Sequence, residues 1–81
     1  MARNFGLSET TGLVVVQVGA NSSAAEAGFR QGDIILEVDQ VRVADLETFK
    51  RKIQAYKKGD TILFLIKRGD ATLYLTLKVE E

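Results

Sequence analysis

The chain alternates between segments with the short period of β-strands and segments with the longer period of helices. Several apolar runs rich in β-branched residues, most of them bounded by Gly, Asp or Asn, have the length and composition of short strands. Arg68-Gly69-Asp70-Ala71 separates the last two runs, so we expect the chain to end in a tight β-hairpin. The runs occupy residues 13–18, 34–38, 41–43, 61–67 and 72–79.

Two further segments carry helix signals. Ser23 and Glu26 have the spacing of a capping box and Gly28 suits the left-handed position after a helix, so one or two helical turns are expected there. A longer helix is expected after Asp45, which suits an N-cap, and before Gly59, which ends it. Its apolar residues recur at helical spacing and are Leu46, Phe49, Ile53 and Tyr56.

The order of these elements is strand, short helix, two strands, long helix and hairpin, which predicts a single α+β domain. Residues 1–11 show no clear period, and we expect an irregular lead-in there. The predicted division of the chain is a lead-in at 1–11, one domain at 12–79 and a tail at 80–81.

Composition narrows the classes of function. Eleven Lys and Arg balance eleven Asp and Glu, so a net charge of zero gives no electrostatic basis for binding nucleic acid. No apolar run approaches the roughly 18 residues that cross a bilayer, so direct membrane insertion is not expected. The absence of Cys and His excludes the usual zinc ligands, a Cys nucleophile and an imidazole base. We therefore expect no metal, no cofactor and no catalytic residue in this chain.

Three features have a structural explanation that we favour over a functional one. Asp33 and Asp39 could share acid and base roles, but Asp is common in turns. Arg68-Gly69-Asp70 is the tripeptide of integrin ligands, but a Gly-Asp pair suits a tight hairpin. The basic residues of the long helix could attract an acidic partner, but they also suit a solvated helix face.

The apolar stripe of the long helix either faces only the core or also forms one wall of a groove. One helix cannot cover a whole sheet. A strand at the sheet edge beside the helix would therefore leave unpaired backbone groups next to exposed apolar side chains. An extended peptide could add to the sheet at such an edge.

Two stretches resemble a bacterial PDZ domain, namely GLVVVQV at 12–18 and SSAAEAGFRQGDIILEVD at 22–39. The similarity continues through Gly59-Asp60 and Arg68-Gly69 to Val79, and it is strongest to the PDZ domains of the HtrA/DegP/DegQ family of envelope serine proteases. The resemblance implies an α+β, PDZ-like partial β-barrel or sandwich of about five short strands with one short and one long helix. It also implies that a polypeptide C-terminus adds to a strand edge and places its last apolar side chain beside the longer helix.

The same resemblance implies the site residues. Leu46, Lys50 and Ile53, with Phe49 behind them, match the groove-lining helix positions of the family. Phe5-Gly6-Leu7 is a weak match to its carboxylate-binding loop, and we expect the ligand-pairing strand of the family to precede such a segment. We therefore expect a fragment with an added Met1 whose groove lacks one wall. Such a fragment would bind peptide weakly or pair its open edge with a second copy.

By this resemblance the chain recruits substrate to a serine protease, or regulates it, and the catalytic residues lie outside the chain. The implied partners are polypeptide C-termini or unfolded segments and the protease domain of the parent, in the periplasm or envelope of a bacterium. Two alternatives stay open. One is a module that assembles protease subunits or a secretion component. The other is a gating PDZ domain of an intramembrane metalloprotease or a carboxy-terminal processing protease.

Overall fold

The computed structural model describes the backbone of residues 5–9 and the complete residues 12–20 and 22–79. These residues form six strands and two helices, so the predicted α+β class with one short and one long helix is confirmed. In chain order the elements are β1 (Phe5–Glu9), β2 (Leu13–Val18), α1 (Ser23–Ala27), β3 (Ile34–Val38), β4 (Val41–Arg42), α2 (Leu46–Gln54), β5 (Thr61–Arg68) and β6 (Ala71–Lys78).

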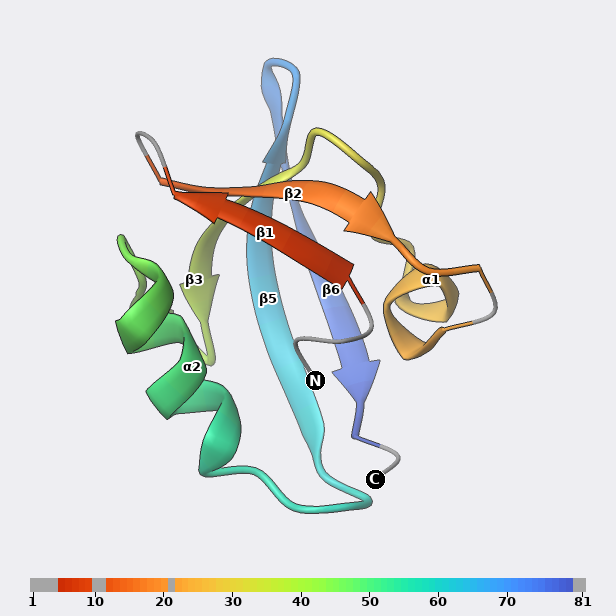
Figure 1. The fold of residues 1–81 in the computed structure, drawn as a ribbon, viewed down its shortest axis with the longest axis vertical. Helices are drawn as coiled ribbons and strands as arrows, with labels where there is room; N and C mark the ends of the chain where they lie inside the picture. The colour runs from red at the N-terminus through yellow and green to blue at the C-terminus, as the bar shows by residue number, and fades with distance from the viewer. Residues whose placement is uncertain (1–4, 10–11, 21, 80–81) are drawn as a thin grey trace.

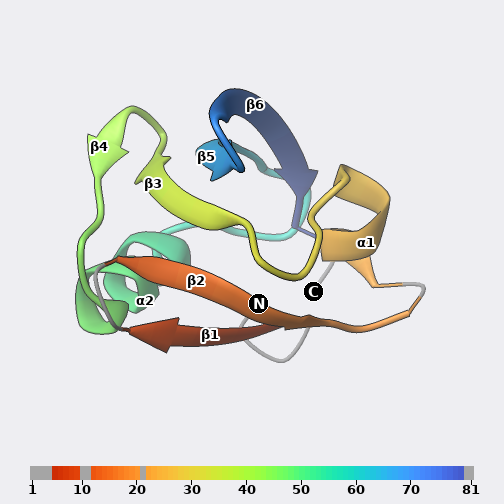
Figure 2. The ribbon, with the colours of Figure 1, turned by 90° about the horizontal axis from the view of Figure 1, so that it is seen from above.

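The strands form one antiparallel sheet in the order β1-β2-β3-β5-β6, and the short β4 pairs with β3 (Figure 1). Seen from above, the sheet folds over on itself (Figure 2). β1 and β2 make one layer, β5 and β6 lie opposite, and β3 joins the two layers. The helices α2 and α1 lie on the two opposite open sides of this arrangement.

The core fills the space between the layers and is built around three aromatic rings. Phe64 of β5 lies between Phe29, whose ring meets it edge-on with centroids 5.0 Å apart, and Phe49 of α2, at 6.3 Å. All three side chains are buried. Phe49 therefore fixes α2 against the sheet. The other large, fully buried apolar residues are Leu13, Val15, Ile35, Val38, Ile62, Ile66 and Leu77.

The helix ends follow local capping chemistry, with two corrections to the predicted bounds. Ser22 rather than Ser23 caps α1, because the Ser22 hydroxyl accepts the hydrogen bond of the Ala25 N–H at 3.2 Å. Asp45 caps α2 as predicted, and its carboxylate accepts from the Thr48 N–H at 2.7 Å. However, α2 ends at Gln54, several residues before Gly59, so Tyr56 lies beyond the helix.

The largest correction concerns residues 5–9, which we expected to be irregular. They form β1, which pairs with β2 from Phe5 opposite Val18 to Glu9 opposite Leu13. A weak local pattern becomes a strand here because β2 offers backbone partners, and strand formation depends strongly on such context. The division of the chain at residue 12 stays a prediction. Residues 1–4, 10–11, 21 and the predicted tail at 80–81 lie outside the described residues.

Candidate functional site

The outer edge of β1 lies beside α2. β1 is the end strand of the sheet and pairs with β2, and no other described strand pairs with it. α2 contacts β1, and both ribbon views place the start of α2 near the end of β1 (Figures 1 and 2). An edge strand of this kind presents backbone N–H and C=O groups to an incoming strand. We call this edge, together with Leu46, Lys50 and Ile53 of α2, the β1–α2 site.

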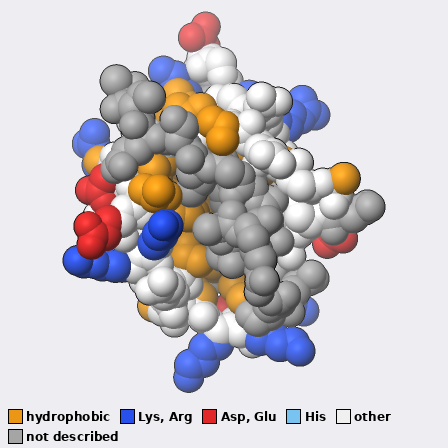
Figure 3. All heavy atoms as spheres, viewed as in Figure 1, with side chains coloured by type: hydrophobic (Ala, Val, Ile, Leu, Met, Phe, Trp, Pro, Cys, Tyr) orange, Lys and Arg blue, Asp and Glu red, His pale blue; other side chains and the backbone are white. Residues whose placement is uncertain are grey.

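The predicted helix residues of this site differ in exposure. Phe49 and Ile53 are buried, with 1% and 8% of their surfaces exposed, and both belong to the core. Leu46 is half-buried against that core, whereas Lys50 is exposed. Figure 3 shows hydrophobic side chains gathered on the face that carries α2, with a Lys or Arg side chain among them. The structure therefore presents Leu46 and Lys50 at the surface and uses Phe49 and Ile53 mainly for packing.

Phe5-Gly6-Leu7 forms the first part of β1, and the pairing register with β2 shifts between Gly6 and Leu7. The expectation that the site lacks a strand on one side is therefore wrong, because β1 occupies that side. Whether Phe5-Gly6-Leu7 binds a carboxylate stays a prediction, as does ligand contact by the helix residues. Sequence reasoning missed β1 itself, because the alternation of the apolar Phe5 and Leu7 with Gly6 and Ser8 was too short a signal to identify it.

The acidic groups of α2 are engaged locally. Glu47 pairs with Arg51 at 3.1 Å, although both side chains are largely exposed. The Asp45 carboxylate accepts the hydrogen bond from Thr48, which lowers the pKa of Asp45 below its ordinary value. Lys50 makes no ion pair with any residue that the structure describes.

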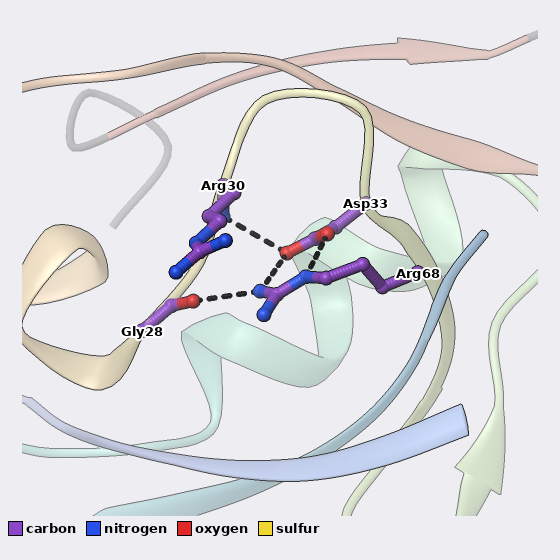
Figure 4. A network of polar contacts seen from close by, with 4 residues as sticks. All are labelled: Gly28, Arg30, Asp33 and Arg68. Carbon is purple, nitrogen blue, oxygen red and sulfur yellow. Dashed lines mark hydrogen bonds and ion pairs between the residues drawn. The ribbon is translucent and has the colours of Figure 1, made fainter. Parts of the chain in front are cut away.

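A second polar cluster lies away from the β1–α2 site and has a structural role (Figure 4). The Asp33 carboxylate accepts two hydrogen bonds from the Arg68 guanidinium, at 2.9 and 2.8 Å, and one from the Arg30 N–H at 2.9 Å. Arg68 also donates to the Gly28 carbonyl at 2.8 Å. Burial raises the pKa of Asp33, but these hydrogen bonds and the nearby positive charges outweigh it and hold that pKa below its ordinary value.

This cluster resolves two of the alternative explanations raised by the sequence. Arg68 is engaged with Asp33, and Gly69 and Asp70 form the two-residue loop of the β5–β6 hairpin, so Arg68-Gly69-Asp70 serves the fold. Asp33 is paired with an arginine and Asp39 lies in the turn between β3 and β4, so the two do not form an acid–base pair. No group of potential metal ligands occurs among the described residues, and none of their helices is long and apolar enough to span a membrane.

Tyr56 ties the end of α2 to the turn after β3. Burial, followed by a hydrogen bond to Asp39, raises the pKa of Tyr56 to about 12. Asp39 itself has a positive φ of 53° and donates its N–H to the Leu63 carbonyl at 2.6 Å. The contact connects the helix to β3 and β5 on the side of α2 that carries Tyr56.

The sequence matches the PDZ domain family over residues 3–79. The chain belongs to this family, and a PDZ domain is a binding module rather than a protease domain. Its relatives include serine endoproteases of the HtrA/DegP type that match over the whole chain, so the predicted family is confirmed.

Two such proteases and one protein of another family illustrate the similarity. A probable periplasmic serine endoprotease DegP-like of Chlamydia trachomatis is 35% identical over the whole chain, which spans 16% of that protein. The structure of the HtrA-type protease AlgW with a decapeptide is 30% identical, with a TM-score of 0.81 over 98% of this chain and 24% of that one. An aminopeptidase N family protein from Idiomarina loihiensis is 29% identical, with a TM-score of 0.87 over 96% of this chain and 13% of that one. The chain thus corresponds to a small part of each relative.

Proposed function

We propose that the chain binds the apolar C-terminal tail of a polypeptide, or another extended segment, by strand addition to β1. The observation that carries this proposal is the outer edge of β1, which pairs with no described strand and lies beside α2. In this mode backbone hydrogen bonds provide affinity, and pockets for alternate side chains provide selectivity. The half-buried Leu46 supplies apolar surface next to the strand, Ile53 packs mainly in the core, and Lys50 supplies a positive charge.

The relatives support a role within a larger protease. The AlgW structure contains a decapeptide, and the Chlamydia relative is named as a periplasmic endoprotease. We infer that the chain serves an HtrA/DegP-like serine protease by recruiting substrate or regulating activity, in the periplasm or cell envelope. Its partners are then polypeptide C-termini or unfolded segments, together with the protease domain of the parent.

The decisive experiment is a titration of the ¹⁵N-labelled chain with a short peptide that ends in an apolar residue. We expect the largest amide shifts in β1 and α2 and binding in the micromolar range, on the order of −8 kcal/mol, because the contact is small. Leu46→Asp should weaken binding about tenfold because it places a charge on the apolar flank. Val41 on β4 is exposed and outside the β1–α2 site, so Val41→Asp is the matched control. Equal affinity of the two variants would contradict the assignment.

The open edge also supports a second candidate, self-association through β1. An exposed edge strand can pair with another copy as readily as with a peptide. Sedimentation of the peptide-free chain over a range of concentrations separates the two functions. Association that a peptide reverses would show that both use the same edge, whereas a monomer at all concentrations would exclude the assembly role for this chain.

A further inference from the structure

We propose that Lys50 makes the β1–α2 site selective for ligands that bring a carboxylate to the flank of α2. This inference rests on the proposed peptide binding and adds the chemistry of the preferred ligand. It begins with helix geometry. At 3.6 residues per turn, Leu46, Lys50 and Ile53 fall within about 60° of one another around α2. Lys50 therefore lies on the same side of α2 as Leu46 and Ile53.

Phe49 sets the orientation of α2, because its side chain is buried in the core. Around the helix, Lys50 lies about 100° from Phe49, on the side that also carries Leu46 and Ile53. Lys50 is exposed at the margin of this face, on a helix that contacts β1.

The charge pattern explains why Lys50 would act on a ligand. The sequence from Lys50 to Lys58 contains five basic residues and no acidic one, although the whole chain has a net charge of zero. The neighbouring Arg51 is already paired with Glu47, whereas Lys50 has no ion pair with the described residues. A lysine stem can cover apolar surface while its ammonium group reaches solvent, so Lys50 can contact both parts of an apolar and acidic tail.

Two sources can supply the carboxylate, namely a Glu or Asp side chain near the end of the ligand and the terminal carboxylate itself. A panel of peptides that end in Val separates them. The residue before the Val is Glu, Gln or Lys, and each peptide is prepared with a free and an amidated C-terminus. Affinities are measured by fluorescence anisotropy for the unmodified chain, for Lys50→Glu and for Lys58→Glu. Lys58 is exposed beyond α2, so its substitution changes the net charge equally and serves as the control.

An exposed ion pair changes affinity modestly, so we expect the unmodified chain to bind the Glu peptide about 2- to 5-fold more tightly than the Gln peptide. Lys50→Glu should reverse the order and favour the Lys peptide, and Lys58→Glu should leave the ratios unchanged. If the terminal carboxylate is the source, amidation should instead remove the Lys50-dependent part of the affinity. Higher salt should reduce either effect.

The outcomes distinguish this inference from the function on which it rests. If the peptides bind but Lys50→Glu does not change their relative affinities, in either the free or the amidated form, the selectivity is overturned. The binding function would then remain intact. Equal changes in Lys50→Glu and Lys58→Glu would show a general effect of net charge and would also overturn it. Failure of every peptide to bind the unmodified chain would refute the proposed function and this inference with it.

Discussion

The Arg68 guanidinium lies 2.8 Å from the Asp33 carboxylate, although the two residues are 35 positions apart in the chain. Asp33 precedes β3, and Arg68 ends β5. The pair therefore links the loop between α1 and β3 to the end of β5. The further bond from Arg68 to the Gly28 carbonyl includes the end of α1 in the same cluster.

We predict that Arg68→Met lowers the free energy of unfolding by about 3 kcal/mol, because it removes the guanidinium that is hydrogen-bonded to the buried Asp33 carboxylate. Urea denaturation followed by circular dichroism measures the loss. The matched control is Arg51→Met, which removes the ion pair with Glu47. Both of those side chains are 77% exposed, so the control should cost about 0.5 kcal/mol or less. Similar small losses in both variants would show that the Asp33 cluster does not stabilise the fold.

The lowered pKa of Asp33 predicts a loss of stability in acid. The unfolded chain takes up this proton near the ordinary value of 3.8, whereas the folded chain takes it up at lower pH. The stabilisation is thus fully present above that value and is lost as the pH falls through the folded pKa. We expect melting temperatures measured from pH 7 to pH 2 to fall less steeply below about pH 4 in Asp33→Asn than in the unmodified chain. Parallel curves would contradict the linkage.

Core packing and ligand contact on α2 should be separable by mutation. Phe49 is 1% exposed and packs near Phe64, so Phe49→Ala should cost about 3 to 5 kcal/mol of stability. Leu46 is half-buried and begins the helix, where an acidic side chain is favourable, so Leu46→Asp should cost about 1 kcal/mol or less. Chemical denaturation of both variants tests this order. A large loss in Leu46→Asp would mean that Leu46 serves mainly the core.

The contact between Tyr56 and Asp39 should be visible in an alkaline titration. Tyr56 and Tyr74 are the two tyrosines of the chain, so Tyr74→Phe isolates the signal of Tyr56. Its tyrosinate absorbance should rise with a midpoint near pH 12, and Asp39→Asn should move that midpoint toward 10. Because the folded pKa is raised, the stabilisation is present below pH 10 and is lost as the pH rises toward 12. A midpoint near 10 before any substitution would show that the contact is absent in solution.

The sequence by itself determined most of the secondary structure, because the signals are local. The apolar runs gave β2, β3, β5 and β6 nearly at their observed bounds, and the Asp45 carboxylate caps α2 as its position indicated. The Gly-Asp pair specified the loop of the final hairpin. The stripe that contains Phe49 and Ile53 correctly indicated the buried face of α2.

Tertiary structure alone decided three matters. Residues 5–9 become β1 because β2 supplies backbone partners, which a five-residue pattern cannot show. Asp33 and Arg68 meet because the sheet brings the start of β3 beside the end of β5. The β1–α2 site exists because sheet order leaves β1 at the edge next to the helix. Each depends on contacts between distant segments, and such contacts are set by the packing of the whole chain rather than by the preferences of neighbouring residues.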